Sequence, residues 1–206
     1  LLTHGHIDHM GGAHALWELT GRRAKVVIHE ADAHLLRSRQ EHVALYTQVR
    51  QQYLGDPEGV AKQTAAGEHA ISGEMEADVL LRGGETLSLG GDVTVSVHPV
   101  PGHTPGSVAY VIDGQNDVFV GDAVQIHGAA NFFPGYEDPT AYRASLEYLR
   151  DEVQPRRLYL GHPYRSADGT PYGIELDAAQ AARALQESID IEGRIAAAAE
   201  GALSDG

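Results

Sequence analysis

The stretch that most constrains the fold of this chain lies at residues 3–12 and reads THGHIDHMGG. It places three imidazoles and one carboxylate close together, at His4, His6, Asp8 and His9. These two groups together form a ligand set for zinc, iron or manganese. Side chains two positions apart point to the same side of an extended chain, so His4 and His6 can converge on one metal ion. Once the chain turns, Asp8 and His9 can face a second ion nearby.

The alternative interpretation of this stretch is a group of surface histidines on a loop. Three distant residues favour the metal site instead: His103 in PGHTPGS, Asp122 in VGDA and His162 in LGHP. A single histidine or aspartate at a strand end is more often structural or solvated than functional. Taken together and in this order, the three indicate the remaining ligands of a site for two metal ions.

Hydrophobic periodicity predicts helices near both ends of the chain and strands in its middle. Helical patterns cover residues 13–19, 31–54, 139–152 and 177–200, with a further polar, Ala-rich helical piece up to about residue 75. Strand patterns cover residues 24–29, 79–81, 85–89, 93–100, 108–113, 118–121 and 158–160, and residues 1–3 fit the end of a buried strand. Strands in such close succession favour an antiparallel sheet. We therefore predict an α+β fold with a sheet-on-sheet core and helices outside.

The length of 206 residues suits one domain, so we predict a single domain over residues 1–206. The segment at about 37–75 is too short for a core of its own, and we interpret it as a helical insertion or lid. The chain begins with Leu1-Leu2 instead of methionine, which suggests that an upstream part is missing.

Composition excludes several classes of function. The net charge of -14 at pH 7 would repel a polyanion, so we expect no nucleic-acid partner. The absence of cysteine excludes disulfides and thiolate metal ligands. No apolar run approaches the roughly 20 residues that a membrane helix needs, so we expect no membrane partner and a cytoplasmic location. A small-molecule substrate is the expected partner, and the sequence indicates no oligomeric state.

From residue 1 to about 165, the motifs H-x-H-x-D-H, G-H-T-P-G-S, G-D and G-H resemble those of the metallo-β-lactamase superfamily of metallohydrolases. The resemblance implies a four-layer αββα sandwich with the metals at one edge of its two sheets. It also implies two groups of ligands and a bridge: His4, His6 and His103; Asp8, His9 and His162; and Asp122. Members normally carry a hairpin-rich half before the first motif, so we expect the N-terminal part of the first sheet to be missing here.

The implied activity is metal-dependent hydrolysis, most simply with zinc and with iron or manganese as alternatives. A hydroxide shared by two ions would attack the carbonyl of a small ester, lactone or thioester. The resemblance implies catalytic roles for two carboxylates. Asp122 would balance charge and fix the metal spacing, and Asp8 would orient the nucleophile. True β-lactamases of the superfamily lack the bridging aspartate, so Asp122 favours the glyoxalase II and lactonase-like branch.

Two departures narrow this branch. Acyl-homoserine-lactone lactonases have a tyrosine where this chain has Gln125, and the C-terminal helix offers only Arg183 and Arg194 as cations for glutathione. The alternatives are a non-catalytic metal-binding sensor on the same fold and, less favoured, a β-lactamase or a metal-dependent nuclease or phosphodiesterase. Turnover separates the sensor from an enzyme.

Other residues follow the ligand-bearing loops and are candidates for the pocket wall: His127, Phe132, Phe133, Tyr136 and Tyr164. Loop packing is an equal alternative for these. The remaining histidines are expected to be surface or structural residues, among them His29, His34, His42, His69 and His98.

Overall fold

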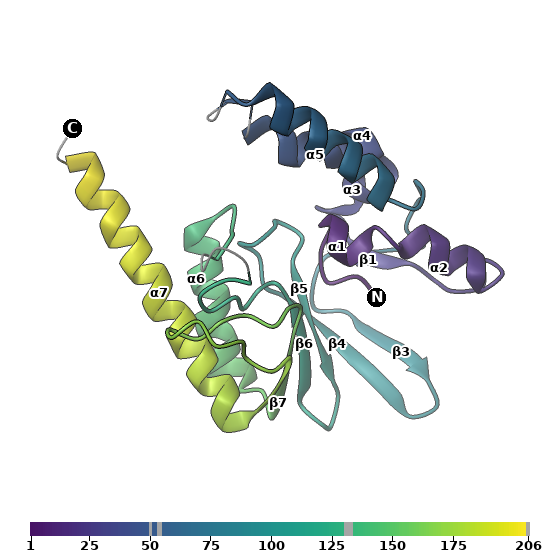
Figure 1. The fold of residues 1–206 in the computed structure, drawn as a ribbon. Helices are drawn as coiled ribbons and strands as arrows, with labels where there is room; N and C mark the ends of the chain where they lie inside the picture. Colours follow the sequence, from purple (N-terminus) through teal and green to yellow (C-terminus); the bar gives the residue numbers. More distant parts are fainter. Residues whose placement is uncertain (50, 53–54, 130–133, 205–206) are drawn as a thin grey trace. The chain divides into compact units, whose positions relative to one another are not determined.

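The computed structural model describes residues 1–49, 51–52, 55–129 and 134–204 (Figure 1). The chain divides into two compact units, Leu1–Arg82 and Gly83–Gly206. Each unit has a hydrophobic cluster of its own, and each is described below by itself. A single domain over residues 1–206 stays a prediction.

The first unit combines short helices with a small parallel sheet. Its helices are α1 (Ile7–Met10), α2 (Ala13–Leu19), α3 (Ala33–Arg37), α4 (Arg39–Val49) and α5 (Pro57–Ala70). Strands β1 (Val27–His29) and β2 (Val79–Leu81) pair in parallel. The helix predicted at 13–19 is confirmed, and the strand predicted at 24–29 is confirmed in its second half. The strand at 79–81 is confirmed too, but it pairs with β1 and not with the antiparallel strands that follow it.

The helix predicted from residue 31 to 54 is wrong in one respect, because it is two helices. Ser38 separates α3 from α4 with extended backbone, at φ -132° and ψ 110°. Its hydroxyl oxygen accepts the Glu41 N–H at 3.1 Å, so this serine caps the second helix. The predicted helix end at residues 53–54 lies outside the described residues.

Leu1-Leu2-Thr3 does not form the predicted strand, although the Leu2 N–H donates to the Val27 carbonyl beside β1. The predicted helical piece up to about residue 75 is confirmed as α5, which ends earlier, at Ala70, and packs along α4 (Figure 1). Whether residues 37–75 act as a lid stays a prediction.

The core of the first unit lies where α1 and α3 meet β1. Its buried side chains are Met10, Val26, Ile28, Ala33 and Leu36. Met10 belongs to the helix that directly follows the metal-ligand motif, so burial of this side chain fixes the end of the motif.

The second unit is built on a six-stranded sheet with strand order β3-β4-β5-β6-β7-β8. The strands are β3 (Thr86–Gly90), β4 (Val93–Pro99), β5 (Val108–Ile112), β6 (Asp117–Gly121), β7 (Arg157–Leu160) and β8 (Glu175–Asp177). Neighbours are antiparallel except β6 and β7, which are parallel. The strands predicted between residues 85 and 160 are confirmed, and β8 was not predicted.

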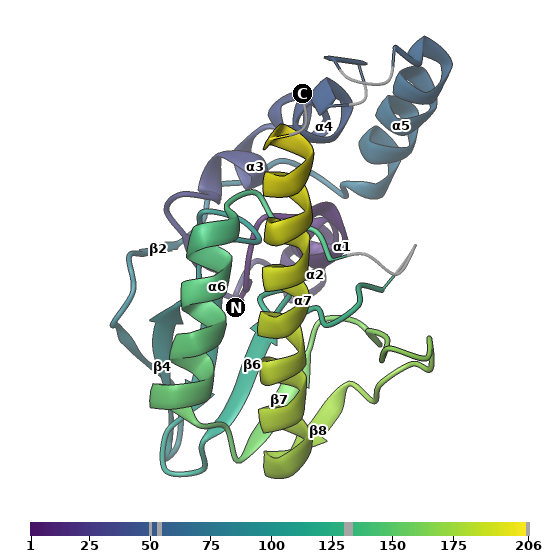
Figure 2. The same cartoon turned by 90° about the vertical axis from the view of Figure 1, so that its left-hand side faces the viewer.

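Two helices lie side by side against one face of this sheet, α6 (Pro139–Tyr148) and α7 (Ala178–Ser204) (Figure 2). They bury Leu146 and Leu185 against strand residues such as Val118 and Leu158. The helix predicted at 139–152 continues from α6 into one π-helical stretch, η2 (Leu149–Val153). The predicted C-terminal helix is confirmed as α7, and the α+β class is confirmed for the described residues. None of the helices in the described ranges is long and apolar enough to cross a membrane.

A buried carboxylate that pairs with two partly exposed arginines fixes the start of β6. The Asp117 side chain is 3% exposed, and its carboxylate accepts hydrogen bonds from Arg156 and Arg157. The Arg157 guanidinium holds the pKa of Asp117 below its usual value, with Arg156 adding to the effect. Because β6 carries Asp122 just after its end, this pair helps to position a predicted metal ligand.

We expect Asp117→Asn to lower the free energy of unfolding by about 1–3 kcal/mol at pH 7, because the arginines lose a charged acceptor. The folded-state pKa of Asp117 is lowered, so its stabilisation is complete above the ordinary carboxyl pKa of about 4 and is lost as the pH falls through the folded-state value. Urea unfolding at pH 7 and at acidic pH should therefore show a shrinking difference between variant and wild type. Asp92→Asn, in an exposed turn, is the matched control. An undiminished difference at acidic pH would contradict this account.

Candidate metal centre

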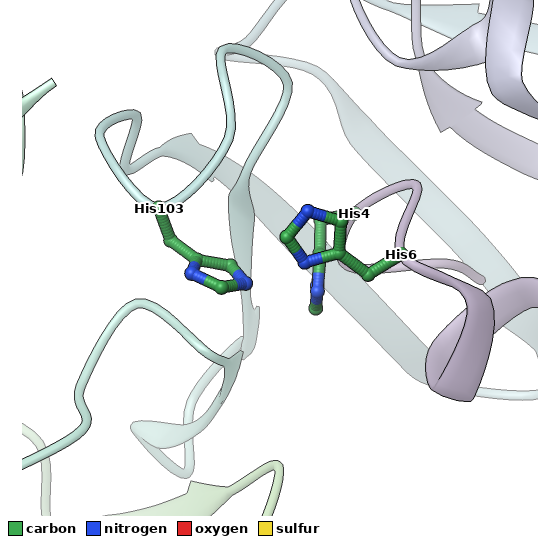
Figure 3. A group of neighbouring side chains, drawn as sticks. All are labelled: His4, His6 and His103. Carbon is green, nitrogen blue, oxygen red and sulfur yellow. The ribbon is translucent and has the colours of Figure 1, made fainter. Parts of the chain in front are cut away.

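In the first unit, the side chains of the N-terminal motif gather in one cluster. The rings of His4 and His6 meet edge to face with centroids 4.9 Å apart (Figure 3), and His9 lies 4.1 Å from His4 by the same measure. His9 Nε2 is 3.7 Å from Asp8 Oδ2. His4 is 1% exposed, whereas the Asp8 side chain is 52% exposed. The cluster therefore runs from a buried imidazole to an accessible carboxylate.

The backbone of this motif is held by a buried carboxylate. The Gly5 N–H donates to Asp32 Oδ2 at 2.8 Å, and Asp32 is 1% exposed. A Cβ added at Gly5 would lie 2.8 Å from the Leu35 side chain and 3.2 Å from the Asp32 carbonyl oxygen, so a larger residue between His4 and His6 would displace these neighbours.

Gly11 is required by close packing and not by a special turn. Its φ of -57° is ordinary for a helix, but an added Cβ would lie 2.8 Å from the Ala70 carbonyl oxygen. The Gly11 carbonyl accepts both the N–H and the hydroxyl of Ser72. Gly11 thus allows a close approach to Ala70 of α5, while a Cβ at Gly12 would meet open space.

In the second unit, one carboxylate oxygen lies between two imidazoles. Asp122 Oδ2 is 3.6 Å from His103 Nε2 and 3.5 Å from His162 Nε2. Asp122 and His103 are 8% and 7% exposed, and the His162 side chain is 29% exposed. Asp122 follows β6 and His162 follows β7, and these parallel neighbours end at the same edge of the sheet.

The loop that carries His103 rests on the start of α6. Gly102 has a φ of +127°, and a Cβ there would lie 2.2 Å from the Tyr142 nitrogen, so glycine is required. Its carbonyl accepts the N–H groups of Glu137 and Asp138 at 2.7 and 3.0 Å. This contact brings the loop end and the helix start together and sets where the His103 side chain begins.

Gln125 orients His103, and the sequence analysis did not assign it this role. Its Nε2 lies 2.8 Å from His103 Nδ1 and donates to the carbonyls of Asp122 and Gly135, while its Oε1 accepts the Gly135 N–H at 2.8 Å. The Gly135 carbonyl, 2.6 Å from His103 Nδ1, can only accept a proton. The tautomer with the hydrogen on Nδ1 satisfies this carbonyl and leaves a lone pair on Nε2, the atom that faces Asp122. Both amide hydrogens of Gln125 go to the carbonyls of Asp122 and Gly135, so Gln125 acts on His103 through Gly135.

The other predicted pocket residues have packing partners in the second unit. His127 Nε2 contacts Glu187 at 2.9 Å, Tyr136 stacks on Tyr142, and Tyr164 is 1% exposed. Phe132 and Phe133 lie outside the described residues. The histidines expected to be surface or structural include His42, which is fully buried, and His98, which contacts the Tyr148 hydroxyl at 2.6 Å.

The sequence matches the family described as the Metallo-beta-lactamase superfamily over residues 1–162. The chain belongs to the metallo-β-lactamase superfamily. The fold predicted from the resemblance is confirmed by this match and by similar solved structures. One of these is the crystal structure of TTHA1623 in a di-iron-bound form, with 27% identity, a TM-score of 0.55, and coverage of 88% of this chain and 73% of that one.

Two curated relatives match parts of the chain. The uncharacterized protein YobT of Bacillus subtilis is 34% identical over 175 residues, which are 79% of this chain and 65% of YobT. A hydroxyacylglutathione hydrolase of Rhodopseudomonas palustris is 36% identical over 122 residues, which are 58% of this chain and 47% of that enzyme. The chain thus spans less than two thirds of either relative.

The donor groups of both units fit a metal of the kind that superfamily members bind. Imidazole nitrogens and carboxylate oxygens are candidate ligands in each unit. Two such ligands, each about 2.1 Å from one tetrahedral ion, lie roughly 3.4 Å apart. The separations of 3.6 and 3.5 Å from Asp122 to its two histidines are close to that value.

We expect Gln125→Met to weaken zinc binding by about 10–100-fold, because methionine fills similar space but loses the hydrogen bonds that orient His103. Competition with a chromophoric chelator measures the affinity. Gln115→Met, in an exposed turn, is the control and should bind zinc as the wild type does. A thermal unfolding scan of each metal-free variant identifies simple loss of folding. A folded Gln125→Met protein with wild-type zinc affinity would exclude the positioning role.

Proposed function

We propose that this chain carries the dinuclear metal site of a hydrolase that acts on a small ester, lactone or thioester. The observation that carries the proposal is the position of Asp122. A single oxygen of this carboxylate is nearly equidistant from His103 and His162, at 3.6 and 3.5 Å. Each separation suits two ligands of one metal ion, and the superfamily resemblance assigns His103 and His162 to different ions, which would make this carboxylate the ligand they share.

In this proposal, three histidines hold one ion: His4, His6 and His103, the side chains drawn in Figure 3. The second ion is held by Asp8, His9 and His162, and Asp122 contacts both. Membership of the superfamily supports this division. Within the first unit, the contact of His9 with Asp8 supports it too.

When bound, two divalent ions would supply Lewis acidity for the attack of water on a carbonyl carbon at neutral pH. The residues of the chain then have separate tasks. Asp122 offsets positive charge and fixes the spacing of the site. The Asp8 side chain is 52% exposed, whereas that of Asp122 is 11% exposed. The greater exposure of Asp8 suits a group that orients the attacking water. Gln125 and Gly135 hold His103 in the tautomer that keeps Nε2 available.

Zinc is the proposed metal, with iron and manganese as alternatives. Nitrogen and oxygen ligands without thiolate suit all three. The similar solved structure in a di-iron-bound form supports iron as the first alternative. The hydroxyacylglutathione hydrolase name of several curated relatives supports an ester or thioester substrate. A small-molecule substrate and a cytoplasmic location belong to the same proposal, as does the absence of nucleic-acid and membrane partners.

We expect close to two metal ions per chain after zinc loading, and about one or fewer in Asp122→Ala, because the shared ligand is gone. Elemental analysis of the purified protein measures the ratio. Asp92→Ala, in an exposed turn, should keep the wild-type value. The same samples are then assayed on esters, lactones, thioesters, a β-lactam, a phosphodiester and RNA.

Hydrolysis of an ester, lactone or thioester that Asp122→Ala reduces by a factor of a thousand or so would support the proposal. Full metal content without turnover of any substrate would favour a metal-binding sensor instead. Cleavage confined to the β-lactam, the phosphodiester or RNA would assign the chain to one of those classes. A folded chain that stays metal-free in zinc-containing buffer would overturn the proposal.

A further inference from the structure

The first unit contains a cavity of about 310 Å³ between α1, α4 and α5. Its volume is near the lower end of the range of small-molecule sites, roughly 300–1,000 Å³. Val43 of α4 is 8% exposed and forms part of its apolar wall, whereas Ala66 and Ala70 of α5 are exposed and stand at its mouth. The cavity is thus apolar inside and open to a ligand from solvent.

Small residues on one face of α5 create this space. Gln63, Ala66, Gly67 and Ala70 all line the cavity, and their spacing of three and four places them along one side of the helix. A Cβ at Gly67 would lie only 3.0 Å from Val43 Cγ2, so the helices approach closely there. Beyond this contact, the short alanine side chains leave the gap between the helices unfilled.

Two polar groups interrupt the apolar wall. The first is the His42 imidazole, which is fully buried. Burial lowers the pKa of His42, so the ring is neutral at neutral pH and presents no charge to a ligand. The second is the Gln63 side-chain oxygen, which is buried and accepts no hydrogen bond from any described residue. A buried acceptor of this kind is costly unless a ligand or water satisfies it.

Ile7 connects the cavity to the metal-ligand motif. Its side chain lines the cavity, and in sequence it stands between the predicted ligands His6 and Asp8. The cavity wall therefore includes one residue of the segment that presents these ligands.

We propose that this cavity binds a short apolar chain of the substrate, one that carries a hydroxyl or amide N–H donor for Gln63. The proposal rests on the proposed hydrolase function and narrows its substrates to esters or thioesters with an apolar acyl or alkyl group. The apolar wall selects the chain, and the Gln63 oxygen selects the donor.

Binding of N-hexylacetamide to the zinc-loaded full chain tests this without turnover. Its hexyl group fits an apolar cavity, and its N–H can donate to Gln63. We expect saturable binding that Ala66→Leu weakens at least tenfold, because the leucine fills the space that the hexyl group needs. The matched control is Ala65→Leu, an exposed neighbour on the same helix that does not line the cavity. Equal affinity of both leucine variants, or no saturable binding by the wild type, would overturn the proposal.

A second variant tests the donor. 2-Nonanone replaces the N–H of N-hexylacetamide with a methylene and cannot be hydrolysed, so the wild type should prefer N-hexylacetamide to it. Gln63→Leu should remove this preference and keep the affinity for 2-nonanone. A preference that persists in Gln63→Leu would exclude this residue as the acceptor.

Hydrolysis of p-nitrophenyl acetate and hexanoate separates the two proposals. We expect Ala66→Leu to lower kcat/KM for the hexanoate about tenfold and to leave the acetate within twofold of wild type. Loss of binding in Ala66→Leu, in a protein that hydrolyses no ester, would keep the cavity assignment and reject the hydrolase. Turnover of both esters that Ala66→Leu does not change would reject the cavity and keep the hydrolase.

Discussion

The hydrogen bond from the Gly5 N–H to the buried Asp32 carboxylate is the constraint on which the first unit depends. It fixes the backbone between two histidines, so both imidazoles project from a segment with little freedom to move. A hydrogen bond to a charged acceptor contributes about 1.5–3 kcal/mol, which is large for a single contact. Leu35 and Asp32 lie so close to Gly5 that a larger residue would displace them, and the ligand spacing therefore depends on the start of α3 as well as on the motif itself.

In the second unit, neutral groups hold the segment that presents His103. A buried amide, Gln125, and the backbone of Gly135 orient His103, while Ser145 donates to the Pro101 carbonyl at 2.7 Å and holds the loop before it. Each of these groups satisfies a polar atom that would otherwise be buried without a partner, so the packing that buries the loop also aims the histidine. The ligand residues are few, but the residues that set their direction come from several elements.

Much of the fold follows from local sequence patterns. Alternating and β-branched runs located β3 to β7, and the helical pattern from residue 139 located α6. The structure adds that Asp138 caps this helix. The misses have physical causes. Ser38 divides a helical pattern through a side-chain cap. β8 contains one buried residue, Leu176, and is stabilised by pairing with β7, which is distant in sequence. The partner of β2 likewise depends on tertiary structure, since its composition suits either sheet.

The sequence indicates which residues are candidate ligands, but it does not indicate which residues hold them in position. His4 to His9 are adjacent in sequence, and Gly flanks His103, Asp122 and His162, so the motif alone named them. In the sequence, Gln125 stands out only because acyl-homoserine-lactone lactonases have a tyrosine there. Its hydrogen bond with Gly135 forms only when the chain folds, so the sequence does not reveal its positioning role. Asp32 had no signal at all, since an aspartate before a helix is usually a cap.

The hydrogen bonds between the Gly102 loop and the start of α6 have a consequence for local opening of the second unit. The amide hydrogens of Glu137 and Asp138 are bonded to the carbonyl next to His103. These hydrogens can exchange with solvent only when the loop and the start of α6 separate. Their exchange rates would therefore report, residue by residue and under native conditions, how often the segment that presents His103 leaves its place.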